Sequence, residues 1–185
     1  MQGFLSALRK NENQQKSSIL LQSIFKMINT KKILILGLGN EILSDDGIGP
    51  RLVHDLSGME IRSDIIFDIA TCGGLELMEY ITGYGKVILL DAIRTTNGIP
   101  GEVYSFKPAD FKETLHLSNL HDINFLTALK LGNQLELELP GDLHIIAVEI
   151  LEDKEFSEEL TSPLRKEYPA ILEEVYSLIE TILKD

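Results

Sequence analysis

Short apolar runs and helix-spaced apolar residues alternate along most of the chain. Four runs are typical of strands buried on both faces of a sheet: Ile33–Leu36, Ile65–Ile69, Lys86–Asp91 and Leu143–Val148. A shorter segment after a Pro-Gly turn, Glu102–Phe106, is expected to form an edge strand. Apolar residues at helical spacing predict four helices, over roughly Gly47–Leu56, Leu75–Thr82, Leu120–Leu131 and Ala170–Leu183.

This alternation predicts the fold class, because strands that alternate with helices are typical of an α/β domain. We expect a three-layer sandwich in which helices flank a mainly parallel twisted sheet, with one antiparallel edge strand. In such sheets ligands bind beyond the carboxyl ends of the strands. That rule points to three places: the loop after Leu36, the loop after Ile69, and Asp91.

Charge divides the chain into two parts. Residues 1–32 carry six Lys/Arg and one acid, a net of +5, whereas residues 33–185 carry eleven Lys/Arg and 28 acids, a net of −17. The first part lacks the apolar run of at least ~7 residues and the cleavage site of a signal peptide, although a weakly amphipathic helix over Ile19–Met27 is one interpretation. We predict an N-terminal extension over residues 1–26, disordered or preceding a native start at Met27, and one α/β domain over residues 27–185.

Overall composition excludes several classes of protein. The net charge of −12 argues against a general nucleic-acid binder, whose affinity rests on Lys and Arg at the phosphates. No apolar run approaches the ~20 residues that cross a bilayer. Cys72 is the single cysteine, which excludes a disulfide scaffold, an iron–sulfur cluster and a thiolate zinc site and is compatible with a reducing cytoplasm.

The first strand-end loop, Gly37–Asn40, is a poor nucleotide site. The third glycine of a dinucleotide fingerprint is missing because position 42 is Ile, and no Lys follows as in a phosphate loop. Asp45 and Asp46, expected at the start of the next helix after a Ser44 cap, would repel a phosphate. From spacing alone, these two acids either stabilise the helix N-terminus or take part in chemistry.

One of the two acids Asp45 and Asp46, together with Asp91 and His121, forms a candidate set for a chemical centre at this end of the sheet. Asp91 ends an apolar strand, so it either caps the turn over Ala92–Thr95 or points into the crevice beside the first loop. His121 is expected in the first turn of a helix, where the dipole favours a neutral imidazole that can bind metal; an ordinary surface or core histidine is the alternative. Two carboxylates and an imidazole suit zinc, nickel, cobalt or iron.

The remaining histidines and the cysteine are weaker candidates. His116 lies in an irregular stretch, His144 lies in a strand, and His54 is expected on a helix face directed away from the first loop. No neighbouring residue in the sequence supports Cys72 as a nucleophile, so we expect it to be incidental.

Three segments together resemble the hydrogenase maturation proteases of nickel–iron hydrogenases. They are GLGNEILSDDGIGPRLV, GGLELMEYITGYGKVILLDAI and LHDINFLTAL. The first is the most specific, with a strand, G-x-G-N, an apolar pair and then D-[DE]-x-x-G at the opening of a helix. The likeness covers about residues 31–183 and leaves residues 1–26 outside it, which fits the expected extension.

The resemblance implies an endopeptidase that removes a C-terminal extension from the precursor of a hydrogenase large subunit after nickel insertion. The family's metal-contacting residues match Asp46, Asp91 and His121, which we predict to be catalytic and to contact nickel carried by the precursor. One departure lies at Asp68–Leu75, where the family's Asp-Gly-Gly-Thr-like loop is one residue longer with shifted glycines. This change bears on which precursor is chosen.

Several mechanisms and functions stay open at this level. The metal can polarise the scissile carbonyl or activate a bound water, or an Asp can act as general base; Asp45 and Glu76 are further acids nearby. Competing functions are a non-catalytic nickel-dependent chaperone or adaptor of the same fold, a peptidase with another substrate, and a peptidyl-tRNA hydrolase, which shares Gly-Leu-Gly-Asn but needs a basic surface. The resemblance implies a cytoplasmic monomer that contacts its precursor transiently, without membrane or nucleic acid.

Overall fold

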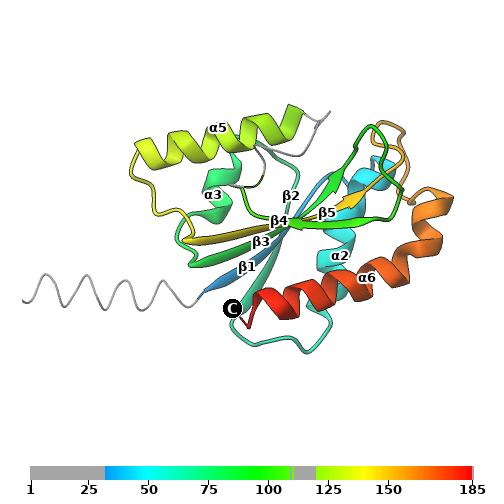
Figure 1. Cartoon of the computed structure of the whole chain (residues 1–185), viewed down its shortest axis with the longest axis horizontal. Coiled ribbons are helices and arrows are strands. Elements are labelled where there is room, and N and C mark those ends of the chain that lie inside the picture. The colour runs from blue at the N-terminus through cyan, green and yellow to red at the C-terminus, as the bar shows by residue number, and fades with distance from the viewer. Residues whose placement is uncertain (1–31, 109, 111–119, 185) are drawn as a thin grey trace, which may run out of the picture.

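The computed structural model describes residues 32–108, 110 and 120–184, with the side chains of residues 120–124 outside the described part (Figure 1). The elements are β1 (Ile33–Leu38), the 3₁₀ turn η1 (Ser44–Gly47), α2 (Ile48–Ser57), β2 (Ile65–Ala70), α3 (Leu77–Ile81), β3 (Lys86–Ile93), β4 (Val103–Phe106), α5 (Leu120–Gln134), β5 (Asp142–Glu149) and α6 (Ser162–Ile182). Every predicted strand and helix of residues 33–185 is present. The predicted extension over residues 1–26, the start at Met27 and the helix over Ile19–Met27 lie outside the described residues.

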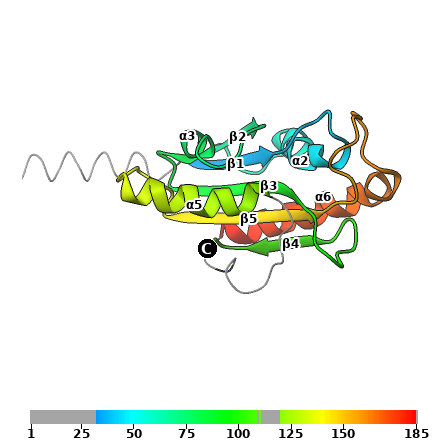
Figure 2. The same cartoon turned by 90° about the horizontal axis from the view of Figure 1, so that it is seen from above.

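A five-stranded sheet in the order β2-β1-β3-β5-β4 forms the middle layer. The first four strands of that order are parallel, and β4 pairs antiparallel with β5 at the edge. Helices α3 and α5 cover one face, and α2 and α6 cover the other (Figures 1 and 2). The predicted α/β sandwich with one antiparallel edge strand is therefore confirmed, and the carboxyl ends of β1, β3 and β5 meet at one end of the molecule.

Each face of the sheet buries its own apolar cluster. Along β3, Ile88 and Leu90 pack into the cluster under α2 and α6, whereas Val87 and Leu89 pack into the cluster under α3 and α5. Continuous apolar strands arise because both faces are covered. Each fully buried Leu or Ile contributes about 1.5–3 kcal/mol, so the core holds the strand ends in fixed positions.

Most predicted boundaries are within about three residues of those in the structure, and the differences in β3 and in the last helix are the most informative. β3 continues past Asp91 to Ile93, because β5 continues to pair with it as far as Glu149. The last helix begins at Ser162 rather than Ala170 and contains Pro169. A proline inside a helix removes a hydrogen bond, but the first turn of α6 buries Leu164 completely in the core, which offsets that loss.

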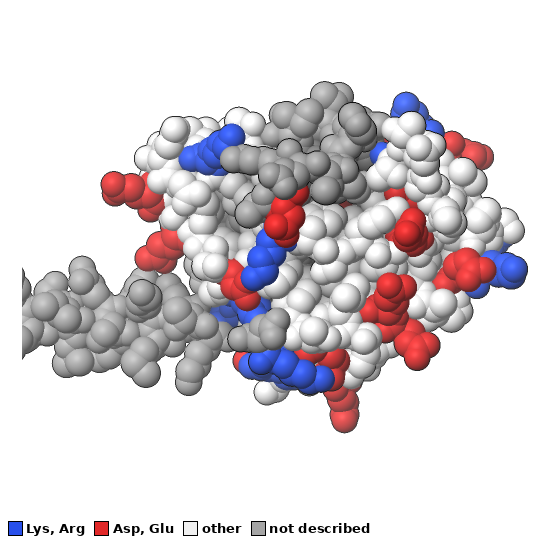
Figure 3. Space-filling model, viewed as in Figure 1, with Lys and Arg blue, Asp and Glu red and all other residues white. Residues whose placement is uncertain are grey.

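Acidic and basic side chains are interspersed over the described surface. Figure 3 shows Lys and Arg scattered among Asp and Glu on one face, rather than gathered in the stripe that a phosphate backbone requires. Several of these cations are paired: Lys86 and Lys107 with Asp142, and Arg94 with Asp153. No helix in the described part of the chain combines the length and apolar character needed to cross a membrane.

Helix α2 packs against the strand ends through Gly49. A Cβ at this position would lie 2.3 Å from the carbonyl oxygen of Leu38 and 2.4 Å from that of Leu90. Gly49→Ala is therefore expected to displace α2 and to lower the free energy of unfolding by about 1–3 kcal/mol, as overpacking does. Urea denaturation measures the change. Gly141→Ala, where nothing lies within 4 Å of the added Cβ, is the control, and equal stability of the two variants would contradict this packing argument.

Candidate active site

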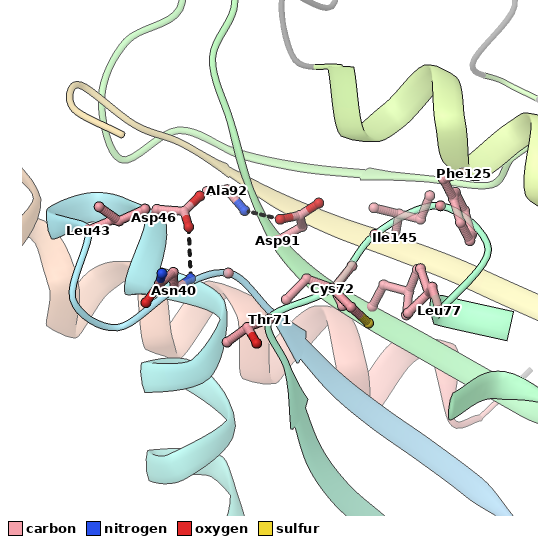
Figure 4. Close-up of a pocket in the computed structure, with 15 residues that line it drawn as sticks. Asn40, Leu43, Asp46, Thr71, Cys72, Leu77, Asp91, Ala92, Phe125 and Ile145 are labelled. Atoms are coloured by element: carbon pink, nitrogen blue, oxygen red, sulfur yellow. Dashed lines mark hydrogen bonds between the residues drawn. The ribbon is translucent and has the colours of Figure 1, made fainter. Parts of the chain in front are cut away.

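A cavity of about 210 Å³ opens at the carboxyl ends of β1 and β3, where the strand-end rule places a ligand. Figure 4 shows Asn40 and Asp46 on one side, Leu77 and Phe125 on the other, and Asp91 between them. The full lining is Leu38, Gly39, Asn40, Leu43, Asp46, Thr71, Cys72, Gly73, Gly74, Leu77, Leu89, Asp91, Ala92, Phe125 and Ile145. Pockets for drug-sized ligands measure roughly 300–1,000 Å³, so this cavity suits a peptide side chain or an ion better than a nucleotide.

Asp46 reaches the cavity because the chain after β1 turns back on itself. Gly39 has φ 130°, and a Cβ there would lie 1.9 Å from the carbonyl oxygen of Asp46, so only glycine lets the two segments cross. The Asn40 backbone N–H donates to Asp46 Oδ2 at 2.7 Å. This bond orients a half-buried carboxylate on the cavity wall.

Asp91 lies on the same cavity, from the neighbouring strand β3. Its Oδ1 accepts the backbone N–H of Ala92 at 2.8 Å, and its side chain is half-buried. The alternative role of capping the turn over Ala92–Thr95 is met only in part, because Oε1 of Glu149 accepts the Thr95 N–H at 2.7 Å. The structure therefore brings Asp46 and Asp91 together on one cavity, as predicted (Figure 4).

His121 lies in the first turn of α5, as predicted, but its side chain is outside the described residues. Residues four apart share one face of a helix, so position 121 lies on the α5 face that carries Phe125 to the cavity. Among the side chains that the structure describes, no three His, Cys, Asp or Glu come together in a group that could hold a metal ion. The role of His121 stays a prediction.

Comparison with known proteins decides the family of a chain with this fold and cavity. A family model described as hydrogenase maturation protease matches residues 50–178. The chain belongs to the hydrogenase maturation protease family. The matched span includes Asp91 and His121, and Asp46 lies just before it.

Individual relatives of this maturation protease agree with the family assignment. It is 31% identical over 123 residues to the hydrogenase 2 maturation protease of Escherichia coli, covering 63% of this chain and 72% of that one. It is 26% identical over 145 residues to the hydrogenase expression/formation protein HupD of Rhizobium leguminosarum, covering 77% and 71%. Its structure is similar to the hydrogenase maturating endopeptidase HybD from E. coli, with a TM-score of 0.63, 26% identity, and coverage of 81% and 93%.

The cysteine and two other histidines of this maturation protease occupy distinct environments. Cys72 lines the cavity, and burial, with help from Glu76 and Glu79, raises the pKa of its thiol, which disfavours the nucleophilic thiolate. His144 is buried in β5 beside Asp142, and burial lowers its pKa despite that carboxylate. His54 is exposed on α2 and does not line the cavity, as expected; His116 lies outside the described residues.

The predicted Ser44 cap is wrong. Helix α2 begins after Gly47, and no side chain caps it. Ser44 instead has φ 52°, its N–H donates to the Ser157 carbonyl at 2.8 Å, and its hydroxyl donates to the Glu159 carbonyl at 3.3 Å. The turn η1 intervenes because the chain must pair here with the loop before α6, a contact far away in sequence.

Asp45 serves the fold of the maturation protease rather than its cavity. The side chain is completely buried. Its two oxygens accept four hydrogen bonds, from the N–H groups of Leu151, Glu152 and Thr161 and from the Thr161 hydroxyl. Sequence reasoning named this acid as a possible helper in chemistry and missed its partners. The one signal in the sequence was the pair of adjacent acids, Asp45 and Asp46, because neighbouring residues in a turn face different environments.

Proposed function

We propose that this chain is an endopeptidase that removes a C-terminal extension from the nickel-loaded precursor of a nickel–iron hydrogenase large subunit. The observation that carries the proposal is the pair Asp46 and Asp91, which line one cavity and are each oriented by a backbone N–H. Family membership supports the proteolytic class. The E. coli relative is a hydrogenase 2 maturation protease, which supports a hydrogenase as the substrate.

Two carboxylates on one small cavity explain how nickel in the precursor can act as a gate. Like charges in a confined site repel, so the cavity disfavours a substrate segment that brings no cation. A carboxylate has about four acceptor positions, so a hydrogen bond to one oxygen leaves capacity to bind a cation. We assign Asp46, Asp91 and His121 as the groups that contact the nickel carried by the precursor.

The proposed reaction adds water across one peptide bond of the precursor. The water oxygen bonds to the carbonyl carbon, the C–N bond breaks, and the departing nitrogen takes a proton. A positioned aspartate can accept the proton of the attacking water, and nickel, as part of the substrate, can polarise the scissile carbonyl. We place this reaction in the cytoplasm, in keeping with the single cysteine.

The proposal predicts nickel-dependent cleavage. Purified full-length chain is incubated with nickel-loaded and nickel-free precursor of the large subunit, and mass spectrometry follows the precursor. We expect the loaded precursor alone to lose a C-terminal peptide, because only it brings a cation to Asp46 and Asp91. Binding of the loaded precursor without cleavage would favour the non-catalytic chaperone, and equal cleavage of both forms would contradict the nickel gate.

A further inference from the structure

The loop between β5 and α6, residues 150–161, is tightly organised. Asp45 binds its first and last parts, through the N–H groups of Leu151 and Thr161. Within the loop, Glu152 Oε1 accepts three successive backbone N–H groups, of residues 153–155. These hydrogen bonds hold the loop in one conformation, which lowers the entropic cost of binding a partner there.

The 150–161 loop is also tied to both segments that carry the cavity aspartates. Asp45, one of its anchors, directly precedes Asp46. On the other side, Arg94, which follows the Asp91 segment, donates to Asp153 at 2.7 Å. Figure 2 shows the loop, in orange, at the end of the molecule where β1, β3 and β5 end. A partner protein bound to this loop would therefore have a fixed position relative to the cavity.

Phe156, on this loop, is exposed to solvent. Phe156 is 80% exposed, and Ile42, 49% exposed, lies beside it in register because the bridge Leu43–Ser157 pairs the next residues of the two segments. We call Ile42 and Phe156 the Phe156 patch. Neither residue lines the cavity. Exposed aromatic residues on rigid surfaces are typical anchors of protein interfaces, so the patch suits a part of a partner other than the segment in the cavity.

The charge around the patch specifies the partner surface. Residues 150–161 contain five acids and one Lys; Asp153 pairs with Arg94 and Glu159 with Arg165, so the other three acids and Lys154 leave a net of −2. Interfaces combine an apolar centre with a charged rim, and complementary charge selects the partner and speeds its encounter. The matching surface has an apolar hollow with Lys and Arg around it.

We infer that the Phe156 patch docks the folded body of the large-subunit precursor, while the C-terminal segment of the precursor enters the cavity. This inference rests on the proposed function, because it takes its occupant from that reaction. The inference adds a second contact region, which binds the folded surface of the precursor rather than its C-terminal peptide. It assigns Phe156 as a residue that determines substrate binding. A residue of this kind binds the ground state and the transition state equally, so its loss raises KM and leaves kcat unchanged.

Phe156→Glu tests the inference with full-length chain and nickel-loaded precursor. We expect KM to rise about tenfold or more, with kcat within about twofold of wild type. Leu135→Glu is the matched control, because Leu135 is also exposed, at 62%, but follows α5 at the opposite end of the sheet. Thermal unfolding of both variants verifies that neither has lost its fold. Biolayer interferometry with immobilised precursor measures the change in Kd independently of cleavage.

Each outcome separates the inference from the proposed function. Wild-type binding without cleavage, weakened tenfold by Phe156→Glu alone, supports docking and contradicts the protease proposal. Normal cleavage by Phe156→Glu with an unchanged KM overturns the docking inference and leaves the protease proposal intact. A fall in the kcat of Phe156→Glu at constant KM has the same consequence. If wild type neither binds nor cleaves the precursor, both are overturned. If light scattering shows a wild-type dimer that Phe156→Glu dissociates, a second copy occupies the patch and the inference is wrong.

Discussion

Asp91→Asn is expected to abolish processing of the nickel-loaded precursor, lowering kcat/KM by at least about a hundredfold, as the loss of an electrostatic group at a reacting centre does. Asparagine has the size of aspartate and retains an oxygen that can accept the Ala92 N–H, so the fold is preserved. It lacks the negative charge that attracts nickel and the basicity that accepts a proton from water. Asp46→Asn, on the same cavity, should have the same effect. A gel shift of the precursor, quantified over time, gives the rates.

Asp64→Asn is the control for this loss. Asp64 lies just before β2, and its exposed carboxylate pairs with Arg62 at 2.6 Å. It does not line the cavity. We expect wild-type processing from this variant. Full processing by Asp91→Asn or Asp46→Asn would remove that residue from the site.

The positions of the strand ends could be predicted from local pattern. Continuous apolar runs identify strands that are covered on both faces, and the sheet then places the loops after β1 and β3 side by side. Register parallel to β1 puts Leu90 opposite Gly37, which brings Asp91 to the first loop. The sheet alone therefore predicts that the first loop and Asp91 meet, whereas the choice of Asp46 over Asp45 came from the resemblance to the family.

The contacts of the 150–161 loop could not be predicted in this way. They join residues more than a hundred positions apart, such as Asp45 and Thr161, and they use backbone N–H groups that carry no residue identity. No periodicity marks them. The Ser44 cap was wrong for the same reason, because the loop pairs with residues 42–44 and replaces the local hydrogen bonds that a cap requires.

The adjacent acids Asp45 and Asp46 thus lie in different environments. Asp45 points inward and fixes the 150–161 loop, whereas Asp46 faces the cavity. A rigid support beneath a reacting group keeps its geometry within the small tolerance that catalysis needs. The two substitutions should therefore separate cleanly, with activity lost at one position and stability lost at the other.

Asp45→Ala is expected to lower the free energy of unfolding by about 3–5 kcal/mol, because it removes a completely buried carboxylate and leaves four part-buried donors without that partner, at about 1–3 kcal/mol each, partly offset by relaxation and water. The affected donors are the N–H groups of Leu151, Glu152 and Thr161 and the Thr161 hydroxyl. For a chain of this length the melting temperature should fall by roughly 10 °C or more. Urea denaturation followed by circular dichroism measures the loss.

Asp68→Ala supplies the comparison for this stability loss, since its carboxylate is exposed and bonds the adjacent Ile69 N–H. Surface substitutions of this kind change stability by about 0.5 kcal/mol. A difference between the two variants of less than about 1 kcal/mol would show that water or other groups satisfy the donors that Asp45 binds. The large difference expected here instead follows from the complete burial of Asp45 and from the four hydrogen bonds that its oxygens accept.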